Sequence, residues 1–157
     1  MNRRNAISLG LAIVSPLAAL QSVLAATEER GTKEEARAMT DAAFEHVRKV
    51  GFDKACADFT SDKTVWTRKD LYVIAFDTKG TFKAHGANDK LVGRDMSNMK
   101  DASGKLIYAA MADTVAKGGG WVDYDWAHPV TKKVEGKSTY VRKTPGGEGF
   151  LGVGIYR

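Results

Sequence analysis

The sequence contains a single cysteine and only three histidines, which excludes several kinds of site. Cys56 cannot form an internal disulfide, and it has no second cysteine for a redox pair or a cysteine-based metal site. The histidines, His46, His85 and His128, are scattered and show no metal-ligand spacing. We therefore expect no metal site, and we expect Cys56 to be a small buried apolar residue on a helix.

The sequence also has only one long hydrophobic run, at its beginning. Arg3 and Arg4 precede an apolar run over residues 6–24, and small residues end it, as in a cleaved secretory signal peptide. We expect residues 1–25 to be removed by the general secretory route rather than the twin-arginine route. An uncleaved anchor is the alternative, but Pro16 interrupts the run. No second stretch approaches the roughly 20 apolar residues of a membrane span, so we expect a periplasmic or secreted protein.

Blocks of five or six like charges are absent. Without residues 1–25, the chain keeps 22 basic and 19 acidic side chains, a formal charge of +3. This mild and interspersed charge argues against a nucleic-acid partner. The remaining residues, 26–157, are enough for one domain with a real core.

Enzyme signatures are missing as well. Asp123 and Asp125 share one face of a predicted strand, where two carboxylates could do acid–base work, but solvated surface charges are the simpler interpretation. Ser103 and Ser138 lack the context of a nucleophile elbow. The loop that begins at Asp77 lacks the alternating oxygen ligands of a calcium site. We predict that the protein is not an enzyme and uses no cofactor.

The segment from Asp70 to Gly86 predicts a β-hairpin. Residues 71–76 are an unbroken apolar run, which is typical of a strand covered on both faces. Asp77 and Gly80 occupy the first and last positions of a turn, where aspartate and glycine are favoured. The second strand, over residues 81–85, ends at His85.

Helices are expected on both sides of this hairpin in the sequence. Thr32 and Glu35 form a capping box before apolar residues at helical spacing, and Gly51 ends that helix. A short helix is expected over residues 53–59, followed by a polar connection over residues 61–69. A third helix, over residues 105–117, follows a long irregular segment at residues 85–104, of a length that usually carries function.

Three further strands, over residues 121–126, 138–143 and 150–156, are joined by short turn-rich connections. The order predicts an α+β domain with a five-stranded antiparallel sheet of PAS-like architecture. The N-terminal helix would cover one face, and the helical insertion between the second and third strands would cover the other. A cavity would then lie between the sheet and the insertion.

The chain contains four characteristic segments: DLYVIAFDTKGTFKAHGANDKLVGRDM, KDASGKLIYAAM, GGGWVDYDWAHPVTKKVEGKSTYVRK and LGVGIYR. Together they resemble a single Cache domain of the second type, in its stand-alone secreted form, and the likeness covers roughly residues 36–157. Gly86 departs from the proline that many chemoreceptor members have after the histidine. The resemblance implies an extracytoplasmic module that binds a small molecule, commonly an organic acid such as a short carboxylate. Signalling would require a partner, such as a membrane receptor or kinase.

Eight residues are candidates for ligand contact. His85 could donate to a carboxylate, or it could be a core histidine satisfied by backbone groups. Arg142 could clamp a carboxylate, or it could be an exposed edge arginine. Tyr108 could close the cavity from the inserted helix, and strand aromatics with polar tips could orient a ligand. Trp121 has the opposite parity to Tyr124 and Trp126, so the two sets cannot share a face. The full set is Tyr72, His85, Tyr108, Trp121, Tyr124, Trp126, Tyr140 and Arg142.

Two function classes remain open. The first is a ligand-binding sensory module, which requires a cavity of a few hundred cubic ångströms. The second is a structural or interaction protein, whose pocket is filled by its own side chains and which binds a partner at the membrane or in the periplasm. Gly152 and Gly154 bare one face of the last strand, which we expect to allow close packing of a helix rather than approach of a ligand.

Overall fold

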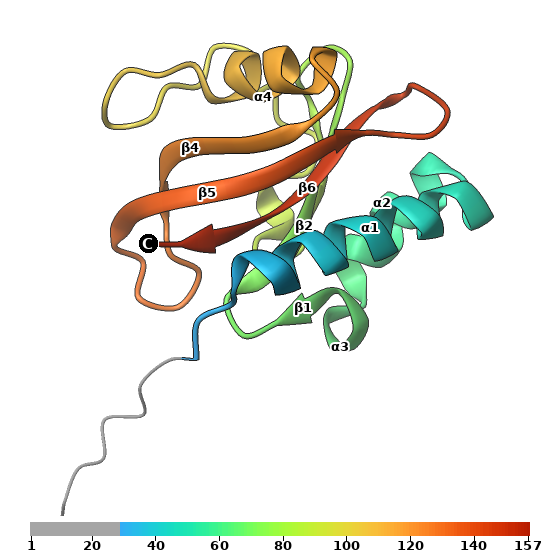
Figure 1. Ribbon diagram of the computed structural model, residues 1–157, viewed down its shortest axis with the longest axis horizontal. Coiled ribbons are helices and arrows are strands. Elements are labelled where there is room, and N and C mark those ends of the chain that lie inside the picture. The colour runs from blue at the N-terminus through green and yellow to red at the C-terminus, as the bar shows by residue number, and fades with distance from the viewer. Residues whose placement is uncertain (1–28) are drawn as a thin grey trace, which may run out of the picture.

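The computed structural model describes residues 29–157 (Figure 1). The predicted signal peptide, residues 1–25, and the predicted start of the mature chain lie outside the described residues. Between residues 29 and 157, no helix has the length and apolar character needed to cross a membrane.

Six antiparallel strands form the sheet, in the order β1-β2-β6-β5-β4, with β3 also paired to β2. Their bounds are β1 (Thr67–Arg68), β2 (Leu71–Asp77), β3 (Phe82–His85), β4 (Gly120–Ala127), β5 (Val134–Lys143) and β6 (Gly149–Tyr156). The predicted hairpins β2-β3, β4-β5 and β5-β6 are confirmed. The pairing of β2 with β6 then joins the N-terminal hairpin to the C-terminal strands.

The predicted polar connection over residues 61–69 was wrong in part. It contains the short helix α3 (Lys63–Trp66) and the two-residue strand β1, which is the sixth strand of the sheet. Trp66 is buried and packs edge-on against Phe59, with ring centroids 4.7 Å apart. Burial of this indole explains why the segment is ordered into regular structure despite its polar composition.

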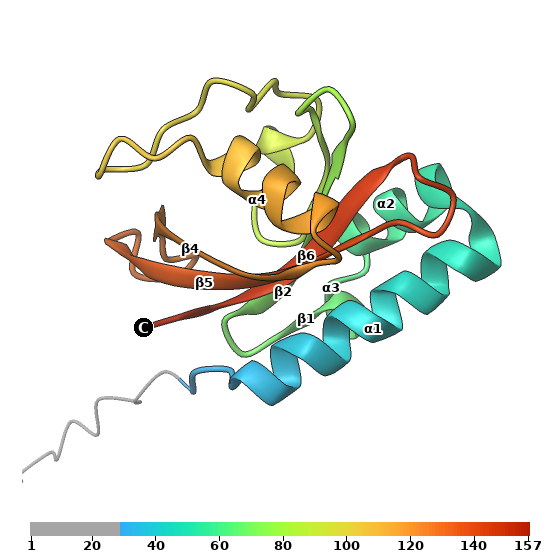
Figure 2. The ribbon, with the colours of Figure 1, turned by 45° about the horizontal axis from the view of Figure 1, so that its top comes forward.

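The N-terminal helices form as the capping signals predict. Helix α1 (Lys33–Val50) begins with a capping box, in which the Glu35 amide donates to Thr32 Oγ1 at 3.2 Å. The Thr32 amide donates in return to Glu35 Oε2 at 2.9 Å. Gly51 follows with a φ of 86°, and the chain enters helix α2 (Phe52–Ser61). The capping box and Gly51 thus define the two ends of α1. Between them the helix runs across one face of the sheet (Figure 2).

Strand β2 is covered on both faces, as its apolar run predicts. All six residues from Leu71 to Phe76 are buried. Leu71, Val73 and Ala75 belong to the core beneath α1 and α2, whereas the alternate residues belong to a second core beneath helix α4 (Ile107–Ala116). The sheet therefore lies between two helical layers, with α1 on one face and α4 on the other (Figures 1 and 2).

The segment between β3 and α4 is mostly irregular, as predicted, apart from the 3-10 turn η1 (Asp89–Leu91). Backbone hydrogen bonds attach it to the first hairpin. The Phe82 amide donates to the Arg94 carbonyl at 3.0 Å, and the Gly93 amide donates to the Phe82 carbonyl at 2.8 Å. The Met96 amide donates to the Gly80 carbonyl at 2.8 Å. These bonds hold the buried Met96 side chain over the sheet, on the same side as α4.

Candidate functional site

A cavity lies between the sheet and its α4 cover, where the sequence predicts one. Aromatic and aliphatic side chains form nearly all of its wall, and no aspartate or glutamate of the described part of the chain lines it. Strands β2 and β3 contribute Tyr72, Ile74, Phe76, Phe82 and His85. Helix α4 and the segment before it contribute Met96, Ile107, Tyr108 and Met111. Strands β4 and β5 contribute Tyr124, Trp126 and Lys137.

The cavity is small. The empty space between its atoms is about 290 Å³, but the centre of a water-sized sphere can occupy only about 10 Å³ of it. That is roughly what a single water molecule needs. A ligand larger than this therefore has to displace side chains on entering, and Tyr108 and Trp126 are lining residues that are only half-buried.

Lys137 places its amine in this apolar cavity. Its side chain is 1% exposed, and Nζ donates to the hydroxyl of Tyr72 at 2.6 Å and to that of Tyr156 at 3.4 Å. Nζ also lies 3.8 Å from the ring centroid of Tyr72 and 4.6 Å from that of Tyr156. The two hydroxyls are 2.9 Å apart, and the Tyr156 hydroxyl donates to the Ala127 carbonyl. Within the part of the chain that the structure describes, the partners of the amine are thus neutral groups.

The strand register explains how Lys137 reaches this position. On β5 it lies between Tyr124 of β4 and Tyr156 of β6, which are its direct cross-strand partners. Gly154 provides the clearance, because a Cβ at this glycine would lie 2.5 Å from Lys137 Cε. The expectation that Gly154 allows close packing of a helix was therefore wrong. The missing side chain instead makes room for the aliphatic stem of Lys137.

Substitution of Gly154 by alanine should lower stability for this reason. The new Cβ would lie 2.3 Å from Thr139 Oγ1 as well as against Lys137 Cε, so the lysine must leave its place. Overpacking of this kind typically costs 1–3 kcal/mol. Urea unfolding of Gly154→Ala should show a loss of that order, and a midpoint equal to that of the wild type would contradict the packing described here.

Burial controls the protonation of Lys137. Removal from water lowers its pKa well below the usual lysine value, and the charge of Asp70 only partly opposes this. Asp70 is itself committed elsewhere, since its Oδ1 accepts a hydrogen bond from the Gly31 amide at 2.6 Å. No carboxylate in the described chain forms an ion pair within 4 Å of the Lys137 amine.

His85 is also buried, at 2% exposure, and faces the same cavity. Its Nδ1 accepts a hydrogen bond from the Asn88 amide at 3.0 Å, so in the neutral ring the proton is on Nε2. Burial, followed by repulsion from Lys137, lowers the pKa of His85 to about 3. The ring is therefore neutral near pH 7 and can donate to a ligand through Nε2–H, without the positive charge that its ordinary pKa would allow.

Five of the eight sequence-predicted residues meet at this cavity. Tyr108 lies on the α4 side, where its hydroxyl donates to the Asp77 carbonyl at 3.3 Å. Tyr124 shares a 2.9 Å hydrogen bond with Thr139, and burial raises the pKa of its hydroxyl. The five are Tyr72, His85, Tyr108, Tyr124 and Trp126.

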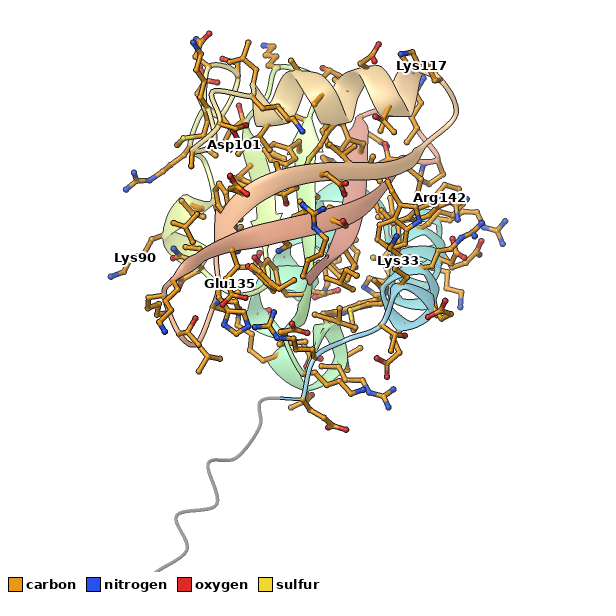
Figure 3. All side chains as sticks on the ribbon, turned by 60° about the vertical axis from the view of Figure 1, so that its left-hand side comes forward. Lys33, Lys90, Asp101, Lys117, Glu135 and Arg142 are labelled. Carbon is orange, nitrogen blue, oxygen red and sulfur yellow. The ribbon has the colours of Figure 1, made fainter. Side chains whose placement is uncertain are left out.

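The other three residues, Trp121, Tyr140 and Arg142, were expected at the pocket but lie on the opposite face of the sheet. Trp121 packs against the core beneath α1. Tyr140 lies under the guanidinium of Arg37, whose Cζ is 5.0 Å from the ring centroid. Arg142 forms an ion pair with Asp41 of α1 and lies beside that helix in Figure 3. The period of two along each strand sends them away from α4.

Lys137 is the functional candidate that sequence reasoning missed. The search for a cation considered Arg142, which lies five residues further along the same strand and therefore on the opposite face. Lys137 precedes the strand predicted over residues 138–143, so its place in β5 opposite Tyr124 is seen only in the structure.

Other sequence-predicted groups are located away from the cavity. Cys56 is buried on α2, as predicted, and burial raises the pKa of its thiol to about 12. Over residues 29–157, no three acidic, histidine or cysteine side chains converge in a way that could hold a metal ion.

Several solved structures have a similar fold. A methyl-accepting chemotaxis protein from Vibrio parahaemolyticus RIMD 2210633 is 23% identical, with a TM-score of 0.68 over 79% of this chain and 87% of that chain. A Cache chemosensory domain described for carboxylic acid recognition is 23% identical, with a TM-score of 0.65 over 78% and 91%. The periplasmic sensor domain of a chemotaxis protein is 24% identical, with a TM-score of 0.60 over 78% and 88%.

These likenesses confirm the predicted fold class. The family model described as Single Cache domain 2 matches residues 5–157, which include the whole sheet, both helical layers and the cavity between them. The chain therefore belongs to the single Cache domain 2 family.

Proposed function

We propose that the protein is a sensory module that binds a small organic acid in the cavity beneath α4. The ligand carboxylate would pair with Lys137 Nζ, and the occupied domain would signal through a separate membrane receptor or kinase. A similar domain is described for carboxylic acid recognition, which supports this ligand class.

The observation that carries the proposal is the buried amine of Lys137, which has hydroxyl partners but no ion-pair partner among residues 29–157, in an otherwise apolar cavity. Such a group is costly to hold charged, and an incoming carboxylate would supply the missing counter-charge. The Nε2–H of His85 is a further donor on the wall of the same cavity, beside the Tyr72 hydroxyl that accepts from Lys137 Nζ. One anionic group with several acceptor sites suits this arrangement.

The proposal includes a non-catalytic role at an extracytoplasmic site. Acid–base catalysis needs two groups whose pKa values are moved apart. Burial instead moves Lys137 and His85 in the same direction, toward their neutral forms. The predicted signal peptide and the likeness to a periplasmic sensor domain support location in the periplasm.

A second function is favoured by the size of the cavity. Space for only about one water molecule is what a structural or interaction protein with a filled pocket would have. In that case the Lys137–tyrosine cluster would serve the core alone, and binding of small molecules would be absent.

A thermal-shift screen of the purified protein separates the two functions. Small carboxylates, neutral amides of the same size, amino acids and amines would be tested. A carboxylate at 100 times its dissociation constant should stabilise the folded state by about 2.7 kcal/mol, whereas the matched amide should not. A flat response to every carboxylate would favour the filled-pocket alternative.

A further inference from the structure

We infer that Tyr108 gates the cavity beneath α4, and that a ligand reaches it along a surface groove between α4 and the β5–β6 turn. The gate rests on the proposed function, which supplies the ligand, but its opening can be measured without one. The closed cavity has room for only about one water molecule. An entering molecule must therefore move part of the wall.

Tyr108 separates the cavity from this groove, because it belongs to the lining of both. The groove is open to solvent, and small residues form much of its wall. Ala112 and Ala116 contribute from α4, and Gly147 and Gly149 contribute from the β5–β6 turn. These residues leave space beside the tyrosine ring. Rotation of the Tyr108 side chain into the groove would join the two spaces.

The contacts of Tyr108 in its closed position suit a side chain that can move. The residue is only half-buried, and its ring centroid lies 5.6 Å from that of Phe150 and 5.7 Å from that of Phe76. Its hydroxyl donates to the Asp77 carbonyl at 3.3 Å, which is long for a hydroxyl donor. Among residues 29–157 this is the only hydrogen bond of that hydroxyl. The closed position therefore depends on one weak polar contact and on ring packing.

Two other residues of the cavity wall are poorer candidates for the gate. Phe82 also borders a groove, beside α2, but it is only 3% exposed and its ring stacks on that of Phe76, with centroids 4.1 Å apart. Trp126 is half-buried, but it borders neither groove and its ring contacts those of Tyr124 and His85 inside the wall. The entrance is therefore assigned to the α4 side.

Thiol labelling measures the opening without a ligand. Ile74→Cys places a thiol on β2 in the cavity wall, where a small methanethiosulfonate reacts only after the wall opens. Tyr108→Phe keeps the ring and removes the hydroxyl. A neutral hydrogen bond typically changes an equilibrium constant by a factor of about 2 to 10. Adding Tyr108→Phe should therefore speed labelling at position 74 by about 2- to 10-fold.

Cys56 is the internal control of the same experiment. It is buried on α2, in the core on the other face of the sheet, so it reports unfolding of the domain rather than opening of the cavity. Its labelling rate should be the same with and without Tyr108→Phe. Equal acceleration of both thiols would overturn the gate, because Tyr108 would then hold the whole fold and not one wall.

Binding kinetics give a second test, in the chain without the introduced cysteine. The best carboxylate from the thermal-shift screen is mixed with the wild type and with Tyr108→Phe in a stopped-flow instrument. A gate is crossed on entry and on exit, so the association and dissociation rate constants should both rise. Loss of a mere ligand contact would raise the dissociation rate constant alone and would overturn the gate.

The outcomes separate the gate from the proposed function. Faster labelling at position 74 in Tyr108→Phe, with no carboxylate bound in the screen, supports the gate and overturns the proposed ligand. Unchanged labelling and unchanged rate constants, with carboxylate binding intact, overturn the gate alone. Faster labelling in Trp126→Phe but not in Tyr108→Phe would place the entrance at β4 and would likewise overturn it.

Discussion

Lys137→Met should weaken binding of a small carboxylate by about 30-fold or more. Removal of one partner from a buried charge pair typically costs 2–5 kcal/mol of binding free energy, and 2 kcal/mol corresponds to about 30-fold. Methionine keeps much of the volume of the lysine stem and removes only the amine. Isothermal titration with the best carboxylate from the thermal-shift screen measures the change directly.

The same substitution should leave the unliganded protein as stable as the wild type or more stable. Replacing a buried charge by an apolar group of similar volume is often neutral or stabilising. Lys143→Met, at the exposed end of the same strand, is the matched control and should bind like the wild type. Equal affinity of Lys137→Met and the control would show that the ligand does not use this amine. A large loss of stability in Lys137→Met would assign the lysine to the core instead.

The local signals of the sequence were sufficient for most of the fold. Thr32 and Glu35 are three residues apart, so the capping box that starts α1 is specified by neighbours in the chain. The apolar run of β2 required cover on both faces, and α1 and α4 supply it. Strand β1 escaped prediction because it has only two residues, and its pairing with Leu71 and Tyr72 depends on tertiary contacts.

The candidate site was harder to predict, because the relevant contacts join residues far apart in the chain. Lys137 and Tyr72 are 65 positions apart, and they meet only because β6 lies between β2 and β5. Parity separates the two faces of a strand but does not say which face has the cavity. Arg142 and Tyr140 were therefore correctly predicted to share one face of the strand, but that face is covered by α1 and does not line the cavity. The strand order, once known, would have pointed to Lys137.

His85 should make the protein sensitive to acid. Its pKa is about 3 in the folded protein and 6.5 in an unfolded chain, so the unfolded state binds the proton first as the pH falls. The contribution of His85 to stability is therefore fully present above about pH 6.5 and is lost progressively between pH 6.5 and 3. The loss should approach about 1.4 kcal/mol per pH unit within that window. Urea unfolding at a series of pH values measures it.

The matched variant is His85→Asn, since the asparagine Oδ1 can take the place of Nδ1 as acceptor for the Asn88 amide. Asparagine does not titrate, so the difference in unfolding free energy between the variant and the wild type isolates the imidazole from the carboxylates that also titrate in acid. That difference should be nearly constant above pH 7 and should shift in favour of the variant as the pH falls toward 4. Lys137 and Lys63 are the charges that act on His85, and both disfavour its protonation, so neither reverses the sign. Parallel curves for the two proteins down to pH 4 would mean that His85 is protonated as readily in the fold as in the unfolded chain. Below about pH 6.5 the ring would then carry a positive charge at the cavity wall, where it could pair with an anionic ligand.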